Sequence, residues 1–400
     1  MLTQTTTHRR LADLAPVTTD SLLALIALCN ADPRTDKIDV GVGVYRDGEG
    51  STPILNVVKD AERKLFETQE TKSYLGMNGD ARFTELLRPI LLGEHAGDRA
   101  IQGLQTPGGC GALVLAFKLI KAANPDARVL VGTPTWPNHI PIIRGVGLEI
   151  VEYPYYDRDG CAIQFDAMLA ALRSARSGDV ALLHACCHNP TGADLSEQQW
   201  DQVVDAVVER GLLPMVDIAY QGLGRGLDED AYGLRKLIAN CDEVLAAQSC
   251  DKNFGVYRDR VGSLWIKTAA EESSTTAMKT VMQLAREMWS MPPDHGAAAV
   301  RIVLDDPATA AAWREELAGM RDRINSLRAR FAAADPRLAF IADQYGMFSM
   351  LPLSKDQVLE LREKHAIYMA DSGRFNVVGM SDAAVDRFVS AVSTVLAGRA

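Results

Sequence analysis

One lysine stands directly after a strand-like run of the sequence. Lys252 follows the β-prone residues Glu243–Gln248 and lies within the polar segment Ser249–Gly255. An amine at the end of a buried strand is costly unless it is paired or used chemically, and burial favours its neutral, nucleophilic form. A lysine whose ammonium group reaches solvent is the commoner outcome for any single lysine. Lys252 is therefore a candidate nucleophile. The residues around it must show whether it reacts or only reaches solvent.

A glycine-rich loop could bind an anion. Thr106–Gly111 reads Thr-Pro-Gly-Gly-Cys-Gly and comes just before a long apolar helical run. Backbone N–H groups at such a helix start can form a phosphate site, although the loop alone is more often a plain turn. The common nucleotide motifs are absent, because Gly41–Arg46 lacks the third glycine of a dinucleotide fingerprint and no Gly-Lys-Ser/Thr occurs.

Polar side chains also follow two other predicted strands. The segment His188–Gly192 comes after Val180–Cys186, and Asp217–Tyr220 closes Leu212–Ile218. In open α/β sheets, ligands gather at the carboxyl ends of the strands. A helix cap or a turn explains either segment taken alone. Their presence together with Lys252 favours a shared binding site.

Together these residues suit a carbonyl cofactor that carries a phosphate group. Lys252 would form a Schiff base with the carbonyl, Asp217 would face a ring nitrogen, and the glycine loop with Arg260 would hold the phosphate. Pyridoxal 5′-phosphate has all three features. We expect no metal, since the seven cysteines are an odd number without the Cys-x-x-Cys spacing of zinc sites.

The elements that must position these residues alternate between strands and helices. Helical patterns near 109–123, 164–175 and 196–210 separate several of the β-prone runs, which indicates a largely parallel sheet covered by helices. After Pro292–Pro293 the pattern changes to long helical stretches, which predicts a second, α+β domain. The β-prone runs of the first part are Arg128–Gly132, Val180–Cys186, Leu212–Ile218, Glu243–Gln248 and Val261–Lys267; the second part contains the helical Ala308–Ala333 and β-prone pieces around Phe348 and at Arg374–Val378.

Length and charge narrow the class of protein. The 400 residues, 47% of them hydrophobic, suit two or three domains or one large α/β domain with a smaller companion. A net charge of −10 argues against broad contact with nucleic acid or an anionic membrane. The apolar run Leu22–Cys29 is too short to cross a bilayer and does not read as a secretory signal. We expect a cytoplasmic protein.

Six motifs give the chain a resemblance to a known family. In order and spacing they resemble those of the aspartate and aromatic amino-acid aminotransferases, class I members of the fold-type I pyridoxal-phosphate enzymes. The motifs are Asp36–Tyr45, Thr71–Gly76, Pro134–His139, Cys187–Gly192, Lys252–Gly255 and Ser372–Asn376. The resemblance covers nearly the whole chain. It implies a large cofactor-binding domain over 45–295 with a mostly parallel seven-stranded sheet, and a small α+β domain from 1–44 and 296–400 that includes an N-terminal arm.

The resemblance also implies roles around the cofactor ring. Lys252 would form the Schiff base and then move a proton as general base and acid. Asp217 would pair with the protonated ring nitrogen. Asn189 and Tyr220 would hydrogen-bond the phenolic oxygen, and Trp136 would stack on the ring face.

Two histidines and a set of phosphate ligands surround these residues in the family pattern. His139 and His184 would orient Asp217, although core histidines with satisfied hydrogen bonds fit the sequence equally well. The phosphate would be held by the glycine loop, by groups near Lys252 and by a tyrosine of the neighbouring subunit: Gly108, Gly109, Cys110, Ser249, Arg260 and Tyr74.

Three further residues would contact the substrate. Arg374 resembles the arginine that grips the substrate α-carboxylate through a bidentate fork, and Gly43 would let the backbone approach the same group. Arg286 resembles the arginine that crosses the dimer interface to a distal carboxylate; without the resemblance it reads as a solvated helix charge. These roles imply a homodimer whose active sites are shared between chains.

Four positions depart from the family pattern. Cys110 and Asp251 stand where hydroxyl residues are usual, and both are expected to weaken the phosphate site. Asp251 either points into that site or turns to solvent or to a cation such as Arg258. Met291 and Ser73 leave the choice between aspartate and aromatic side chains open.

The sequence therefore predicts an aminotransferase that moves an α-amino group between aspartate or an aromatic amino acid and a 2-oxo acid, with 2-oxoglutarate as the expected partner substrate. The alternative is a pyridoxal-phosphate lyase, decarboxylase or oxidase on the same scaffold, for which Asp251 is the only hint. A regulator with an aminotransferase-like sensor would need a DNA-binding module, for which the residues before Asp36 are too few.

Overall fold

A seven-stranded sheet forms the centre of the computed structural model, which describes residue 14 and residues 21–398. The strands lie in the order β2-β10-β9-β8-β7-β3-β4. Neighbours run parallel except β10, which is antiparallel to both β2 and β9. The predicted α/β fold with a mostly parallel sheet is thus confirmed. Its strands are β2 (Ile101–Pro107), β3 (Arg128–Thr133), β4 (Glu149–Pro154), β7 (Val180–His184), β8 (Leu213–Ile218), β9 (Val244–Ser249) and β10 (Val261–Lys267).

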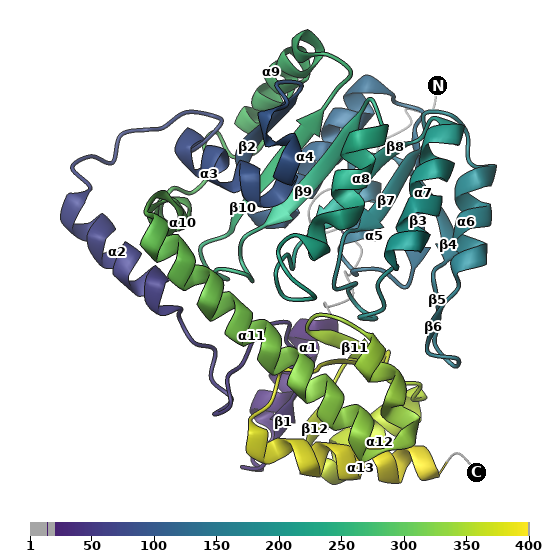
Figure 1. Ribbon diagram of the computed structural model, residues 1–400. Coiled ribbons are helices and arrows are strands. Elements are labelled where there is room, and N and C mark those ends of the chain that lie inside the picture. The colour runs from purple at the N-terminus through teal and green to yellow at the C-terminus, as the bar shows by residue number, and fades with distance from the viewer. Residues whose placement is uncertain (1–13, 15–20, 399–400) are drawn as a thin grey trace, which may run out of the picture.

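Helices cover both faces of this sheet (Figure 1). One apolar core lies between the sheet and the helices α4 (Gly108–Ala123), α5 (His139–Val146) and α9 (Glu271–Met288). A larger core on the other face continues into the C-terminal part of the chain. Its sheet-covering helices are α3 (Ala81–Leu92), α6 (Phe165–Ser174), α7 (Glu197–Arg210), α8 (Tyr232–Asn240) and α10 (His295–Asp305).

Local signals explain why the predicted central elements form where they do. Strands β7, β8 and β9 are buried along almost their whole length, so their sequences are nearly continuous apolar runs. Helix α7 begins at a capping box between Ser196 and Gln199 and ends at Gly211 in the left-handed conformation.

The prediction from periodicity did not include the two edge strands of the sheet. In β4, Glu149 and Glu152 interrupt the apolar pattern, and β2 includes Gln102 and Gly103. An edge strand has one unpaired side and tolerates polar residues, so no continuous apolar run marks it. The strand β2 matters here because it leads directly into the glycine loop.

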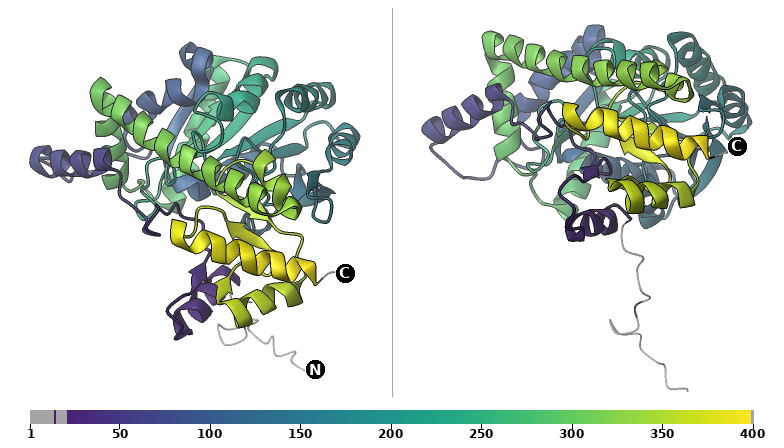
Figure 2. Two further views of the ribbon diagram at one scale, coloured as in Figure 1. Left: turned by 60° about the horizontal axis from the view of Figure 1, so that its bottom comes forward. Right: turned by 90° about the horizontal axis from the view of Figure 1, so that it is seen from below.

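The C-terminal part of the chain packs below the carboxyl ends of the central strands, together with the N-terminal segment (Figures 1 and 2). Strand β1 pairs with β12 in parallel, and β11 pairs with β13 in antiparallel fashion. The predicted domain boundaries at 44/45 and 295/296 stay a prediction. This part comprises α1 (Ser21–Ala31), β1 (Ile38–Asp39), α11 (Pro307–Ala334), β11 (Phe348–Met350), α12 (Lys355–His365), β12 (Ile367–Tyr368), β13 (Arg374–Asn376) and α13 (Val385–Ala397).

The remaining elements are short or peripheral. Helix α2 (Asn56–Thr68) packs against α10, and β5 (Tyr156–Asp157) pairs with β6 (Ala162–Ile163). Within the described part of the chain, none of the helices combines the length and the apolar character that a membrane span requires. The 3-10 helices are Gly93–Gly97, Glu229–Ala231, Pro336–Asp343 and Asp382–Ala384.

Candidate active site

A cavity of about 230 Å³ lies where the central sheet meets the C-terminal part of the chain. It opens at the carboxyl ends of β7, β8 and β9, the expected place for a ligand in an open α/β sheet. Most predicted site residues line it: Gly43, Gly109, Cys110, Trp136, His184, Asn189, Asp217, Tyr220, Ser249, Lys252 and Arg374. Four lining residues were not predicted, because apolar or small side chains carry no chemical signal in a sequence: Leu113, Cys186, Ala219 and Phe348.

Lys252 places its amine on the wall of this cavity. The Nζ atom lies 3.5 Å from Ser249 Oγ and 5.3 Å from the centre of the Tyr220 ring. Burial lowers the pKa of the Lys252 amine, and the nearby Asp251 and Asp217 carboxylates oppose that effect without cancelling it. The amine is therefore more often neutral at neutral pH than an exposed lysine would be.

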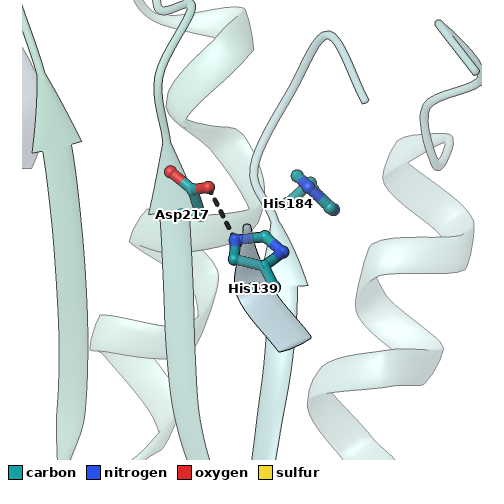
Figure 3. Close-up of side chains that lie close together, drawn as sticks. All are labelled: His139, His184 and Asp217. Carbon is teal, nitrogen blue, oxygen red and sulfur yellow. Dashed lines mark hydrogen bonds and ion pairs between the residues drawn. The ribbon is translucent and has the colours of Figure 1, made fainter. Parts of the chain in front are cut away.

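Asp217 ends strand β8 and is fixed by a histidine. His139 Nε2 lies 3.0 Å from Asp217 Oδ2, and His139 Nδ1 lies 2.8 Å from Thr135 Oγ1 (Figure 3). The Nε2–H group of His139 donates to the Asp217 carboxylate, and its Nδ1 atom is hydrogen-bonded to the Thr135 hydroxyl. Burial raises the pKa of the Asp217 carboxyl, but the His139 hydrogen bond and the surrounding positive groups hold it below its ordinary value. Asp217 is thus an ionised carboxylate in a buried position.

A row of aromatic and imidazole rings continues from His139 through His184, which lines the cavity, to His188 and Tyr155. The His184 ring centre is 5.1 Å from that of His139 and 4.2 Å from that of His188, which stacks on Tyr155. Burial lowers the pKa of His184 to about 3, so this imidazole is neutral. His188 and Tyr155 could not be connected to Asp217 from the sequence, because the connection depends on packing between β7 and its neighbours.

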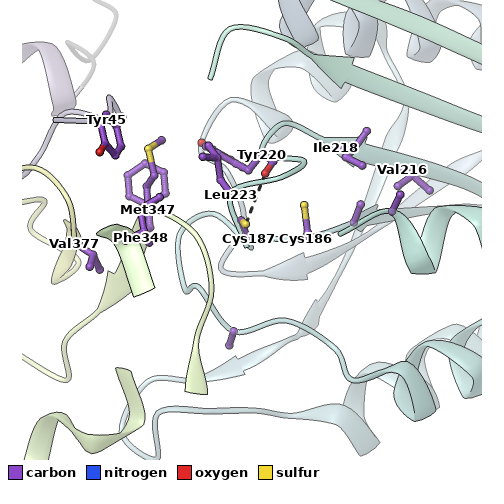
Figure 4. Close-up of a cluster of buried hydrophobic side chains, with 14 of the residues drawn as sticks. Tyr45, Cys186, Cys187, Val216, Ile218, Tyr220, Leu223, Met347, Phe348 and Val377 are labelled. Carbon is purple, nitrogen blue, oxygen red and sulfur yellow. Dashed lines mark hydrogen bonds between the residues drawn. The ribbon is translucent and has the colours of Figure 1, made fainter. Parts of the chain in front are cut away.

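Tyr220, Asn189 and Arg374 form one polar wall of the cavity. Asn189 Nδ2 donates to Tyr220 Oη at 3.4 Å, and Arg374 Nη1 donates to Asn189 Oδ1 at 3.5 Å. Arg374 Nη2 also donates to the Gly41 carbonyl at 2.8 Å. The guanidinium carbon lies 4.7 Å from the centre of the Phe348 ring, which packs across from Tyr220 (Figure 4). These contacts hold a cation at the edge of the cavity beside two hydrogen-bonding side chains.

The glycine loop forms the start of helix α4, as an anion site requires. Gly108 is the first residue of the helix and has φ +68°. No side chain caps the first turn of α4, so its N–H groups lack the usual side-chain acceptor. A Cβ atom on Gly109 would lie 3.1 Å from Ser249 Cβ, and Asn138 Nδ2 donates to Cys110 Sγ at 3.4 Å. The loop therefore offers backbone donors close to Ser249.

Asp251 does not turn to solvent but pairs with a nearby cation, which is Arg260 and not the Arg258 given as the example. Its carboxylate is fully buried and forms an ion pair with Arg260 Nη1, while Oδ1 accepts from the Val261 N–H at 2.8 Å. Arg260 itself has φ +57° and lies against the glycine loop, because a Cβ on Gly108 would be 2.6 Å from Arg260 Nη2. The backbone donor that fixes Asp251 belongs to the neighbouring strand, which is why the sequence could not identify the pair.

Four predicted site residues do not line the cavity of this chain: Gly108, Arg260, Tyr74 and Arg286. Gly108 and Arg260 lie against each other at the start of α4. Tyr74 is 91% exposed, and Arg286 is exposed on helix α9. Both were predicted to act in the site of a neighbouring subunit, and that role stays a prediction.

The residues that are present fit pyridoxal phosphate. A partly neutral amine, an ionised carboxylate and an uncapped helix start face one cavity, and these match the carbonyl, the ring nitrogen and the phosphate of that molecule. Trp136 lines the same cavity and is held edge-on to His139, with ring centres 5.2 Å apart. Lys252, Asp217 and the glycine loop would hold the cofactor, and Trp136 would cover its ring.

The sequence is similar to those of known proteins over nearly the whole chain. Residues 35–392 match the family described as aminotransferase class I and II. The chain is 48% identical to the tyrosine aminotransferase of Rhizobium meliloti (strain 1021), over 92% of this chain and 96% of that protein. It is 42% identical to the aspartate aminotransferase of Escherichia coli (strain K12), over 94% and 98% of the two chains.

A solved structure agrees in both fold and cofactor chemistry. The crystal structure of the aromatic-amino-acid aminotransferase from Burkholderia pseudomallei, covalently bound to pyridoxal phosphate, superposes with a TM-score of 0.92 at 38% identity. The match covers 96% of this chain and 98% of that one. The fold described above is therefore shared with a protein that carries this cofactor.

Proposed function

Because the chain belongs to the class I and II aminotransferase family, we propose that its cavity binds pyridoxal phosphate and moves an α-amino group between an amino acid and a 2-oxo acid. The observation that carries this proposal is the convergence of the Lys252 amine, the Asp217 carboxylate and the start of α4 on one cavity. When bound, the cofactor supplies a carbonyl carbon that condenses with amines and a ring that withdraws electrons from the substrate α-carbon.

Lys252 is the residue that moves protons in this proposal. Burial lowers the pKa of its amine, so Nζ is able to accept a proton near neutral pH and to return it afterwards. Ser249 Oγ and the Tyr220 ring limit where the amine can point. A general base whose pKa lies closer to the working pH is more effective than an ordinary lysine.

Asp217 has the charge needed to hold a protonated ring nitrogen. Its carboxylate is ionised and oriented by His139, whose other nitrogen is fixed by Thr135. A charge-assisted hydrogen bond inside a cavity contributes about 1.5–3 kcal/mol. Asn189 and Tyr220 add hydrogen-bonding groups on the opposite polar wall.

Arg374 is the proposed ligand of the substrate α-carboxylate. Its guanidinium is only 9% exposed, lines the cavity and is held in place by Gly41, Asn189 and the Phe348 ring. The planar fork of arginine matches a carboxylate through two parallel hydrogen bonds. Gly43 lies beside it and a Cβ there would come within 2.8 Å of Phe348 Cζ, so a larger residue would narrow the site.

The proposed substrates are aspartate or aromatic amino acids, with 2-oxoglutarate as the amino acceptor. The relatives with the similarities given above act on both classes, as their names state. The apolar Leu113 and Phe348 on the cavity wall are compatible with an aromatic side chain. Arg286 of a second chain is the proposed partner of a distal carboxylate.

We also propose a homodimer with shared active sites. Large apolar side chains are exposed along residues 54–75, a pattern typical of protein interfaces. They are Ile54, Phe66, Tyr74 and Leu75, with exposures of 52%, 88%, 91% and 49%. Tyr74 in this segment is the proposed phosphate ligand of the neighbouring subunit.

A cytoplasmic location is part of the proposal as well. The seven cysteines are free thiols, and the neighbours Cys186 and Cys187 are both buried. Unpaired cysteines are typical of a reducing compartment.

Product analysis tests the proposed reaction. Purified protein with pyridoxal phosphate, an amino acid donor and 2-oxoglutarate should form one glutamate for each 2-oxo acid released. Oxygen uptake and carbon dioxide release should stay at the level of a protein-free control. Carbon dioxide, consumed oxygen or unequal amounts of the two products would instead favour a lyase, a decarboxylase or an oxidase.

A further inference from the structure

Asp251 lies beside the two groups that are proposed to hold the cofactor, although no catalytic role has been assigned to it. It directly precedes Lys252 and is fully buried. Its Oδ1 atom accepts from the Val261 N–H at 2.8 Å, and its own N–H donates to Ser249 Oγ at 3.3 Å. The backbone of Asp251 is therefore held by Ser249, and its carboxylate cannot rotate away without losing the bond from the Val261 N–H.

The partner of this carboxylate is Arg260. Arg260 Nη1 is paired with Asp251 Oδ2 and also donates to the Tyr257 carbonyl at 3.2 Å. The other terminal nitrogen, Nη2, faces the glycine loop, since a Cβ on Gly108 would come within 2.6 Å of it. A Cβ on Gly108 would also lie 3.2 Å from Asp251 Oδ2. The loop, the guanidinium and the carboxylate thus touch one another at the start of α4.

This contact changes the charge that a phosphate would meet. A guanidinium with a free positive charge attracts a phosphate strongly, whereas one already paired with a buried carboxylate has part of that charge neutralised. The carboxylate also repels the phosphate directly, and burial reduces the screening by water and salt. In return, the ion pair keeps Arg260 in one orientation while no phosphate is bound.

We infer that Asp251 is a positioning residue that acts as a resident anion for Arg260: it holds the guanidinium against the glycine loop and competes with the phosphate of the cofactor. The inference rests on the proposed function. It predicts that the protein holds the phosphate of pyridoxal phosphate more weakly than the same site without this carboxylate. The cofactor should consequently exchange with solution more readily, while the site stays assembled without it.

The test compares two substitutions at position 251 in the protein freed of cofactor. Asp251→Asn removes the charge but keeps a side-chain oxygen that can accept from the Val261 N–H. Asp251→Ser also removes the charge, and its side chain is too short to contact Arg260. Dissociation constants are measured by calorimetry for pyridoxal phosphate, inorganic phosphate and pyridoxal, which lacks the phosphate. Asp259→Asn, on the same turn, is the control for the change in net charge.

The expected result is specific to the phosphate group. Asp251→Asn should bind pyridoxal phosphate and inorganic phosphate about 10- to 100-fold more tightly, as expected for one removed charge at low screening. Its affinity for pyridoxal should change much less, because pyridoxal responds only to the lower pKa of the Lys252 amine. Asp251→Ser should also bind phosphate more tightly, but its cofactor-free form should melt at a lower temperature than that of Asp251→Asn. Asp259→Asn should match the unmodified protein.

Two outcomes overturn the inference. Unchanged or weaker phosphate binding in a folded Asp251→Asn protein would mean that the carboxylate does not compete with phosphate. If that variant does not fold, unchanged or weaker binding by Asp251→Ser has the same meaning. A protein that fails to bind pyridoxal phosphate with Asp251 in place would instead reject the proposed function, so the two failures are distinguishable.

Discussion

At the scale of single residues, the reactivity of the cavity comes from pKa changes with identifiable causes. Burial lowers the pKa of the Lys252 amine, and the His139 hydrogen bond with nearby positive groups keeps the pKa of Asp217 below its ordinary value. Both pKa values therefore lie below their ordinary values: the Lys252 ammonium loses its proton more easily than an exposed lysine, and the Asp217 carboxyl stays ionised although it is buried. Each change can be tested by removing its cause.

Lys252→Ala should abolish covalent attachment of the cofactor and lower turnover by at least about 10²- to 10⁴-fold, since general acid–base catalysis contributes that much. Borohydride reduction of the unmodified protein with its cofactor, followed by peptide mapping, should place the label on Lys252. Lys355→Ala, which removes an exposed lysine of α12, is the control and should behave as the unmodified protein. A label on any other lysine would contradict the assignment.

His139→Leu should make cofactor binding more sensitive to acid. His139 supplies both a hydrogen bond and a charge effect that lower the pKa of Asp217, so its removal raises that pKa. Asp217 would then gain its proton at a higher pH, and the ion pair with a protonated ring nitrogen would be lost earlier as pH falls. The dissociation constant of pyridoxal phosphate, measured between pH 5 and 8 (about the range in which histidine titrates), should rise about tenfold or more at the acid end.

The control for this experiment is His295→Leu, because His295 is about half exposed at the start of α10. Its pH profile should coincide with that of the unmodified protein. If His139→Leu bound pyridoxal phosphate more weakly by the same factor at every pH, the cause would be a packing defect and not a change in the pKa of Asp217.

At the scale of elements, two connections carry most of the phosphate site. The β2–α4 junction supplies Gly108 with φ +68° and an uncapped helix start, and the β9–β10 turn supplies Ser249, Lys252 and Arg260. Antiparallel pairing of β10 with both β2 and β9 brings these connections together. A Cβ on Gly262 of β10 would lie 2.5 Å from the Gly108 carbonyl carbon, which shows how closely the strand and the loop approach.

Gly108→Ala tests this close approach, and Gly147→Ala is its matched control. Both glycines have positive φ, but a Cβ on Gly147 would meet no atom within 4 Å, whereas one on Gly108 would crowd Arg260. The left-handed conformation alone should cost each variant about 1 kcal/mol in free energy of unfolding. Only Gly108→Ala should also lose affinity for inorganic phosphate. Equal phosphate affinities in both variants would show that the loop does not contact the anion.

At the scale of the whole molecule, the cavity is built from segments that are far apart in the chain. Gly43, Phe348 and Arg374 come from the N- and C-terminal parts, whereas Asp217 and Lys252 come from the central sheet. The proposed homodimer adds a further requirement, because Arg286 and Tyr74 are exposed and lie outside the cavity of their own chain. Each complete site would then need two chains.

Mixing two variants that each lack a different residue of the site tests whether the site is shared between chains. Arg286→Leu should lower kcat/KM for aspartate about 10- to 100-fold, since it removes a charged hydrogen bond, and should affect tyrosine much less. Lys252→Ala should be inactive with both substrates. When the two are unfolded together and refolded at equal amounts, half of the dimers should be mixed and one site in each should be intact. Aspartate activity should therefore return to about a quarter of the normal value. Activity no greater than the sum of the separate variants would place Arg286 in the site of its own chain.

The central strands and the chemical groups of the site could be predicted from the sequence. Strand β10 lies where the β-prone run Val261–Lys267 predicted it, because buried strands need continuous apolar sequence and that requirement is local. Lys252 and Asp217 could be identified because they lie at the ends of predicted strands, which meet at one edge of a sheet. The glycine loop could be identified because it precedes an apolar helical run. The edge strand β4 was missed because polar residues are tolerated there.

Which of these groups lie together depends on the packing of the folded chain. The pairing of Asp251 with Arg260 depends on the approach of β10 to the glycine loop, and the row from His139 to Tyr155 depends on how β7 packs against its neighbours. Phe348 enters the cavity although its side chain has no chemical signature in the sequence. A sequence records the type of each group and its spacing along the chain, whereas charge pairing, burial and the resulting pKa values depend on distances in space, which exist only after the chain has packed.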